Sequence, residues 1–171
     1  MLSLNNEYIM KESYSGNISS EIRKVTSKEG QHPKAIVITC SDSRVIPEII
    51  LQAGIGELFV IRVAGNVIDQ TEIASIEYAV QHLKVKDIIL LGHTQCGAIQ
   101  ATIHGEFDGN AGVITRRIKK AIGNETNPLR ACRMNVKSGV MEIRNIFGSD
   151  VHVVGAIYDI ETGRIQFEEF M

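Results

Sequence analysis

The chain has 171 residues, a length typical of one compact domain. Hydrophobic residues make up 44% and charged residues 22%, which excludes a disordered chain. The longest apolar runs, such as residues 88–91, are far shorter than the roughly 20 residues that a membrane span needs. The net charge is −2 and no block of basic residues occurs, which argues against binding to nucleic acid.

The first residues and the cysteine count indicate the compartment. The stretch 1–12 has neither the basic flank nor the long apolar run of a secretory signal. The chain contains three cysteines, Cys40, Cys96 and Cys132, too few and odd in number for a disulfide framework. We therefore expect a cytoplasmic protein in which a cysteine in a special context serves metal binding or catalysis.

Strand and helix patterns alternate along the chain after a polar N-terminal arm that ends at about residue 17. Short β-rich runs predict strands at 35–39, 58–63, 87–91, 151–156 and, after a turn-like stretch, 164–167. Apolar residues at helical spacing predict helices at 19–28, 47–52, 71–83, 113–122 and 130–146. Asp69, three residues before Glu72, resembles a capping box for the third helix.

This alternation predicts an α/β fold with a single domain over residues 1–171. We expect a central, mainly parallel sheet of four strands with a fifth, antiparallel strand at its edge, and helices on its faces.

Two short segments carry the residues most typical of a reactive site. CSDSR at 40–44 directly follows the first predicted strand, and GHTQCG at 92–97 directly follows the third. Ligands of open α/β sheets bind at the carboxyl ends of the strands. Cys40, His93 and Cys96 are therefore expected to converge there.

Two thiolates and one imidazole form a donor set that suits zinc. Three protein ligands leave a fourth position for water, which is typical of a catalytic rather than a structural site. Cys132 is the alternative fourth ligand, but it falls within a predicted helix with no second ligand beside it. A buried, apolar role for Cys132 is the competing interpretation.

Asp42 and Arg44 add a charged pair next to the expected metal site. Asp42 lies two residues after Cys40, close enough to reach the metal or its water. Arg44 can hold the carboxylate through two parallel, charge-assisted hydrogen bonds. Taken alone, Asp42 would be interpreted as a turn-capping residue and Arg44 as a surface residue. Beside the Cys-His-Cys set, a functional role is favoured for both.

The two segments resemble the zinc-site motifs of the β-class carbonic anhydrases. The resemblance extends to RVAGN at 62–66, where Val63 replaces the asparagine usual in the family, and to GAIYDIETG at 155–163. It implies that Cys40, His93 and Cys96 bind one zinc ion per subunit. It also implies that Asp42 and Arg44 form the catalytic pair. If its link to Arg44 breaks, Asp42 can become the fourth zinc ligand, in a closed state known in some members of the family.

The resemblance also suggests a substrate pocket. Gln31, Phe59 and Tyr78 match pocket residues of the plant-type subgroup, in which the pocket lies at a dimer interface. We expect Gln31 and the backbone amide of Gly97 to hydrogen-bond the substrate oxygens that gain charge. A homodimer or a larger homo-oligomer is the implied assembly.

The implied activity is the reversible hydration of CO₂ to bicarbonate and a proton by zinc-bound hydroxide. Two thiolates make zinc less acidifying than a three-histidine site would, so we expect activity to rise toward alkaline pH. Two alternatives remain open from the sequence. They are a hydrolase acting on carbon disulfide or carbonyl sulfide at the same metal site, and a non-catalytic zinc-binding regulatory module.

Overall fold

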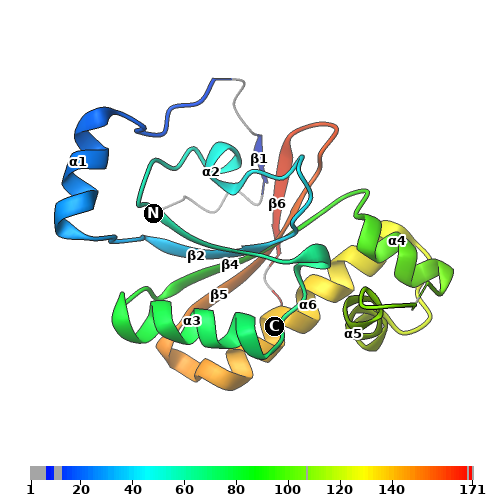
Figure 1. Ribbon diagram of the computed structural model, residues 1–171. Coiled ribbons are helices and arrows are strands. Elements are labelled where there is room, and N and C mark those ends of the chain that lie inside the picture. The colour runs from blue at the N-terminus through cyan, green and yellow to red at the C-terminus, as the bar shows by residue number, and fades with distance from the viewer. Residues whose placement is uncertain (1–6, 10–12, 107, 169, 171) are drawn as a thin grey trace.

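A six-stranded sheet organises the described residues (Figure 1). Its strand order is β1-β6-β5-β4-β2-β3. The computed structural model describes residues 7–9, 13–106, 108–168 and 170. The strands are β1 (Glu7–Ile9), β2 (Ala35–Thr39), β3 (Leu58–Arg62), β4 (Asp87–His93), β5 (His152–Tyr158) and β6 (Arg164–Glu168). Strands β3, β2, β4 and β5 run parallel, and β6 pairs antiparallel with β5.

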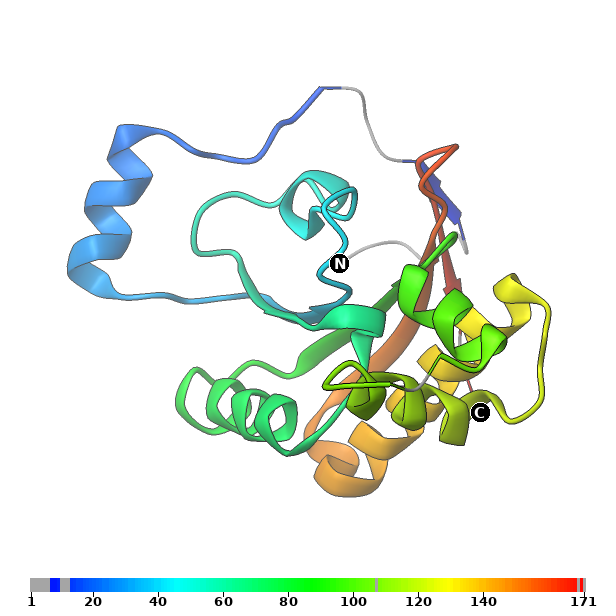
Figure 2. The same ribbon diagram turned by 45° about the vertical axis from the view of Figure 1, so that its right-hand side comes forward.

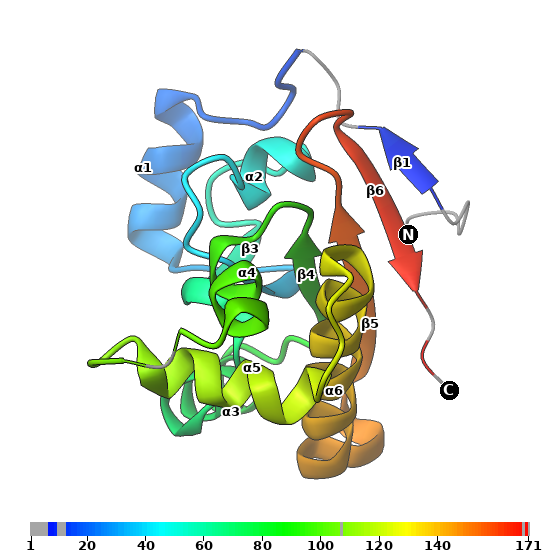
Figure 3. The same cartoon turned by 90° about the vertical axis from the view of Figure 1, so that its right-hand side faces the viewer.

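The predicted four parallel strands and the fifth, antiparallel strand are confirmed. The expectation that this fifth strand forms the edge is wrong, because β1 from the N-terminal arm pairs antiparallel with β6. Figure 3 shows β1 beside β6 at this side of the sheet. A three-residue strand is too short to produce a readable alternation pattern, and its place depends on the backbone edge that β6 offers.

In the described part of the chain, six helices connect the strands: α1 (Ser20–Glu29), α2 (Pro47–Ile50), α3 (Gln70–His82), α4 (Gly97–His104), α5 (Gly112–Ile122) and α6 (Pro128–Phe147). Short 3-10 turns occur at Ala64–Asn66 and Gly148–Asp150. Residues of α3, α4, α5 and α6 form the main core on one face of the sheet. A smaller core on the other face includes Val37, Ile89 and Ile50 of α2, so β2 and β4 are buried on both faces.

Local sequence signals explain where several helices begin. Asp69 and Glu72 form the predicted capping box at the start of α3. At α6, Asn127 accepts a hydrogen bond from the Arg130 amide, and Pro128 occupies the first turn. Helix α4 was not predicted. Its eight residues begin with glycine and include β-branched side chains, which weakens the helical signal.

Helix α1 differs from the others because none of its residues is buried. Figure 2 shows it at the margin of the molecule. Within the described part of the chain, no helix combines the length and the apolar character that crossing a membrane requires.

Helix α6 approaches β4 very closely at Gly139. A Cβ atom at this position would lie 2.5 Å from Cδ2 of Leu90 and 3.3 Å from Cγ1 of Ile68. Both neighbours are buried, so neither can move without disturbing the core. The absent side chain at Gly139 is therefore a packing requirement of the helix–sheet contact.

We expect Gly139→Ala to lower the free energy of unfolding by about 1–2 kcal/mol. Overpacking a core costs about 1–3 kcal/mol, more than the gain of up to about 1 kcal/mol that alanine brings to a helix. Urea denaturation measures the difference. Ser138→Ala, on the exposed side of the same turn, is the control and should leave stability unchanged or raised. A Gly139→Ala protein as stable as this control would contradict the packing argument.

Candidate metal centre

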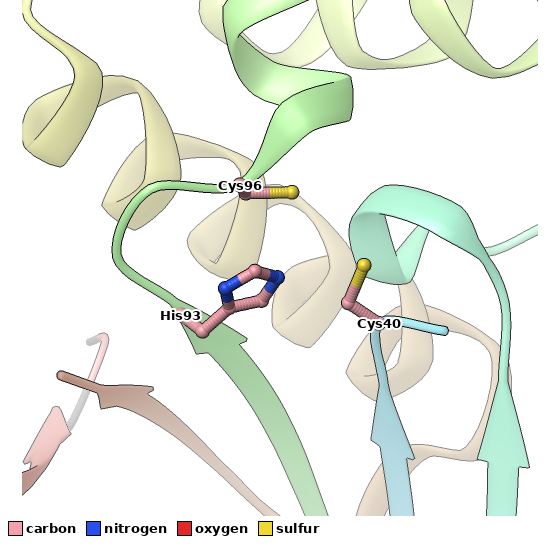
Figure 4. A group of neighbouring side chains, drawn as sticks. All are labelled: Cys40, His93 and Cys96. Carbon is pink, nitrogen blue, oxygen red and sulfur yellow. The ribbon is translucent and has the colours of Figure 1, made fainter. Parts of the chain in front are cut away.

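The in-register pairing of β2 and β4 builds the site. Thr39, the last residue of β2, pairs with Leu91 of β4, and its Oγ1 donates a 2.9 Å hydrogen bond to the Leu91 carbonyl. Cys40 follows β2 directly, and His93 is the last residue of β4. Cys96 is the residue before α4. The two segments predicted from the sequence therefore meet at the same end of the sheet (Figure 4).

Cys40, His93 and Cys96 direct their ligand atoms toward one another (Figure 4). All three residues are buried, with exposed fractions of 5%, 0% and 2%. Their ligand atoms lie within 4.8 Å of one another. Ions bound by sulfur at about 2.3 Å and by nitrogen at about 2.0–2.1 Å fit a cluster of this size. Among the described residues, this is the group of three that could hold a metal ion.

The hydrogen bonding of His93 leaves its Nε2 atom available to a metal ion. Its Nδ1 lies 2.8 Å from the carbonyl oxygen of Thr94, and because a carbonyl can only accept, Nδ1 carries the proton. Nε2 then presents a lone pair. This buried atom has no hydrogen-bond partner among the described residues, and an orphaned buried acceptor is costly. A cation between Nε2 and the two sulfurs would remove that cost.

The two thiols are electronically unequal. The hydrogen bond from Cys96, together with that from the Gly65 amide, lowers the pKa of Cys40. The Gly65 N–H donates to Cys40 Sγ at 3.2 Å. The same contact with Cys40, together with burial, raises the pKa of Cys96. One thiolate therefore forms readily, and binding of a cation would favour release of the second proton.

Asp42 and Arg44 form the predicted two-pronged pair. Arg44 Nε donates to Asp42 Oδ1 at 2.9 Å, and Arg44 Nη2 donates to Asp42 Oδ2 at 2.7 Å. These hydrogen bonds hold the pKa of Asp42 well below its usual range. Asp42 Oδ2 lies 4.0 Å from Nε2 of His93. An ionised carboxylate is thus held at the margin of the Cys-His-Cys cluster.

Arg62, the first residue of the segment RVAGN at 62–66, supports the loop that follows β2. Its guanidinium donates to the backbone carbonyl of Cys40 at 3.2 Å and to that of Asp42 at 2.7 Å. Arg62 is the last residue of β3 and pairs with Thr39 of β2. An arginine at the carboxyl end of a neighbouring strand was the available signal. The two hydrogen bonds from Arg62 hold in place the loop that carries Cys40.

Cys132 of α6 lies beside the cluster but points elsewhere. Its Sγ donates to the backbone carbonyl of His93 at 2.8 Å. Burial raises the pKa of this thiol to about 11, so it stays protonated at neutral pH. The geometry does not group Cys132 with the three ligand candidates. It is buried, as the apolar interpretation requires, but it also makes a polar contact that sequence reasoning missed.

The predicted substrate residues are not gathered at this end of the sheet. Phe59 pairs with Ile36, four residues before Cys40, which corresponds to about 13 Å along the strand. The Tyr78 ring lies 6.2 Å from that of Phe59, and Gln31 lies in the exposed segment that enters β2. Only Gly97, the first residue of α4, adjoins the metal cluster.

Comparison with known proteins agrees with this architecture. The family model described as carbonic anhydrase matches residues 35–165, which is more than half of the chain. The chain belongs to the β-class carbonic anhydrase family. The matched region contains all three ligand candidates and the Asp42–Arg44 pair.

Similar proteins include a carbonic anhydrase of Mycolicibacterium smegmatis, 32% identical over 87% of this chain and 81% of the relative. Carbonic anhydrase 2 of Mycobacterium tuberculosis is 35% identical over 79% of this chain and 74% of its own. Among solved structures, tetrameric β-carbonic anhydrases of Sordaria macrospora superpose with a TM-score of 0.74 at 31% identity. That match covers 88% of both chains.

We expect the purified chain to bind zinc in equimolar amount through Cys40, His93 and Cys96. Cys40→Ser and Cys96→Ser should each weaken zinc binding by more than the roughly 10–100-fold that loss of an outer partner costs. Competition with a chromophoric chelator measures the affinity. Cys132→Ser, which keeps a donor toward the His93 carbonyl, is the control. Loss of zinc from Cys132→Ser alone would make Cys132 the ligand and contradict this assignment.

Proposed function

We propose that the chain catalyses the zinc-dependent, reversible hydration of CO₂ to bicarbonate and a proton. The observation that carries this proposal is the buried cluster of Cys40, His93 and Cys96, in which Nε2 of His93 has no other described partner. Two thiolates and an imidazole are a donor set that zinc prefers. The family to which the chain belongs supports the same activity.

Zinc held by three protein ligands would supply Lewis acidity and make a hydroxide nucleophile available near neutral pH. The chain's own contribution is the charged pair beside the cluster. Asp42 is ionised, so its carboxylate can only accept a hydrogen bond. By accepting one from the attacking hydroxyl, Asp42 turns the oxygen lone pair toward the carbon of CO₂.

Arg44 keeps Asp42 in the role of acceptor. Both Asp42 oxygens are engaged by Arg44, and Arg44 Nη2 also donates to the Gln95 carbonyl at 3.3 Å. This anchoring holds the carboxylate at the margin of the cluster. The closed state, with Asp42 as the fourth zinc ligand, would require this pair to break. The arrangement in the structure is therefore the one that suits the open, active site.

We also propose that the active site is completed by a second copy of the chain. Gln31, Phe59 and Tyr78 lie toward the amino-terminal ends of β2 and β3, away from the metal cluster at the carboxyl ends. Within one chain these residues cannot line the space in front of the metal. Tyr78 is 47% exposed, as a residue reaching into a partner's site would be.

The edge strand β3 is a suitable surface for that second copy. Among the strands that the structure describes, it pairs only with β2, and an unpaired edge is a template for another chain. Its apolar residues Leu58–Ile61 are only half-buried. Val60 belongs to neither described core cluster. A homodimer that covers β3 would bury these side chains, and tetrameric neighbours in the family fit such an assembly.

The remaining inferences concern location and the alternatives. The three cysteines are free and buried, which fits a reducing compartment, so we place the enzyme in the cytoplasm. The complete Asp42–Arg44 pair weighs against a non-catalytic zinc module. No observation favours hydrolysis of carbon disulfide or carbonyl sulfide over hydration of CO₂.

Asp42→Ala should retain zinc but lose hydration activity by on the order of 10²-fold, the typical contribution of a positioned proton-handling group. Stopped-flow CO₂ hydration, scanned from neutral to alkaline pH, measures the rate alongside zinc content. Asp87→Ala, which removes an exposed carboxylate paired with His152 at the far end of β4, should match the wild type. A zinc-loaded Asp42→Ala protein with full activity would refute the role of Asp42.

Val60→Lys should convert the dimer into monomers and abolish hydration, because the site would lose the partner's residues. Sedimentation equilibrium measures the mass, and zinc content should stay equimolar. Val113→Lys replaces an exposed apolar residue of α5 and should leave the assembly intact. A monomeric wild type with full activity would show instead that one chain suffices.

A further inference from the structure

One face of α6 contacts the backbone of two turns next to the metal-ligand candidates, at His93 and at Gly65. Cys132 and Asn135 are three residues apart, so they lie on the same side of the helix. Cys132 Sγ donates to the His93 carbonyl at 2.8 Å, and Asn135 Nδ2 donates to the Gly65 carbonyl at 2.9 Å. Both contacts are buried. Helix α6 thus holds the backbone behind the site at two points.

Gly65 is the residue through which the second contact reaches the cluster. Its N–H donates to Cys40 Sγ at 3.2 Å, while its carbonyl accepts from Asn135. The two hydrogen bonds lie on either side of one Cα atom. The orientation of the Gly65 N–H toward Cys40 Sγ therefore depends on the backbone dihedral angles of Gly65.

Gly65 has no side chain that could restrict its backbone dihedral angles. Its φ is +67°, a conformation that glycine adopts freely but has no inherent reason to keep. A Cβ atom there would lie 2.7 Å from Cδ1 of Ile118 and 3.0 Å from Cβ of Ala98, so a side chain cannot supply the constraint. The surrounding turn, Ala64–Asn66, has no side-chain cap at its start, and one backbone hydrogen bond closes it, from the Asn66 amide to the Val63 carbonyl at 2.9 Å. That bond does not engage the Gly65 carbonyl, which is held from a neighbouring element by Asn135.

We propose that Asn135 is a positioning residue of the metal centre. By holding the Gly65 carbonyl, it keeps the Gly65 N–H directed at Cys40 Sγ. An N–H···S hydrogen bond withdraws charge from a thiolate and orients it, as outer partners do for metal ligands in general. Asn135 is 7% exposed, so water cannot replace its amide. This inference rests on the proposed zinc site.

The test replaces zinc by Co²⁺, whose sulfur-to-cobalt charge-transfer band reports the charge on the thiolates. Asn135→Asp keeps the shape of the side chain but removes the donor. It should move the band to lower energy, because a thiolate without its N–H donor is more electron-rich. Zinc affinity, measured by chelator competition, should fall about tenfold.

Arg144→Met is the matched control. It removes another side-chain donor of α6, which bonds the Val153 carbonyl at 2.7 Å, at a distance of about 13 Å along the helix from Asn135. It should lower stability without moving the band or the zinc affinity. Unchanged band and affinity in Asn135→Asp, or equal shifts in Arg144→Met, would overturn the proposal.

A measurement on the wild type covers the case in which Asn135→Asp does not fold. In the ¹¹³Cd-loaded protein, a scalar coupling between the Gly65 amide proton and the metal should be visible across Cys40 Sγ. A coupling between the Asn135 side-chain nitrogen and the Gly65 carbonyl carbon should accompany it. Absence of either coupling overturns the proposal. A wild type that binds no metal would instead refute the zinc site itself.

Discussion

The parallel, in-register pairing of β2 with β4 is the constraint on which the site depends. It brings Thr39 beside Leu91, so the residues that follow the two strands lie at the same end of the sheet. A slip by one residue would turn every side chain of β2 to the opposite face. Both strands are almost entirely buried, and such a slip would exchange the two cores. The register that packs the interior therefore also places Cys40 beside His93.

Charge balance explains the groups around the cluster. Two thiolates and the carboxylate of Asp42 would place three negative charges in a largely buried space, which a divalent cation alone would not neutralise. Arg44 pairs directly with the carboxylate. Arg62 and the Gly65 amide direct further donors at the backbone of the Cys40 loop and at its sulfur. These donors stabilise the negative charges of the thiolates and the carboxylate, both before and after a cation binds.

Much of the fold and the candidate cluster was predictable because both follow patterns in the chain. The β-branched runs mark the buried strands, and the two cysteine-bearing segments follow two of them directly. The supporting contacts were not predictable, because they join side chains to backbone groups far away in the sequence. Asn135 and Cys132 lie in an ordinary amphipathic helix, and only packing of α6 against the sheet shows which carbonyls they reach.

Two groups of predicted site residues lie at opposite ends of the sheet. The metal cluster and Asp42 lie at the carboxyl ends of the parallel strands, whereas Phe59 and Tyr78 lie near the amino ends. A parallel sheet has no means of bringing its two ends together, since its strands are rigid and each residue adds about 3.3 Å. If both parts serve one reaction, the missing part must come from another copy of the chain. The half-buried, unpaired edge of β3 lies next to Phe59 and offers the place where that copy would join.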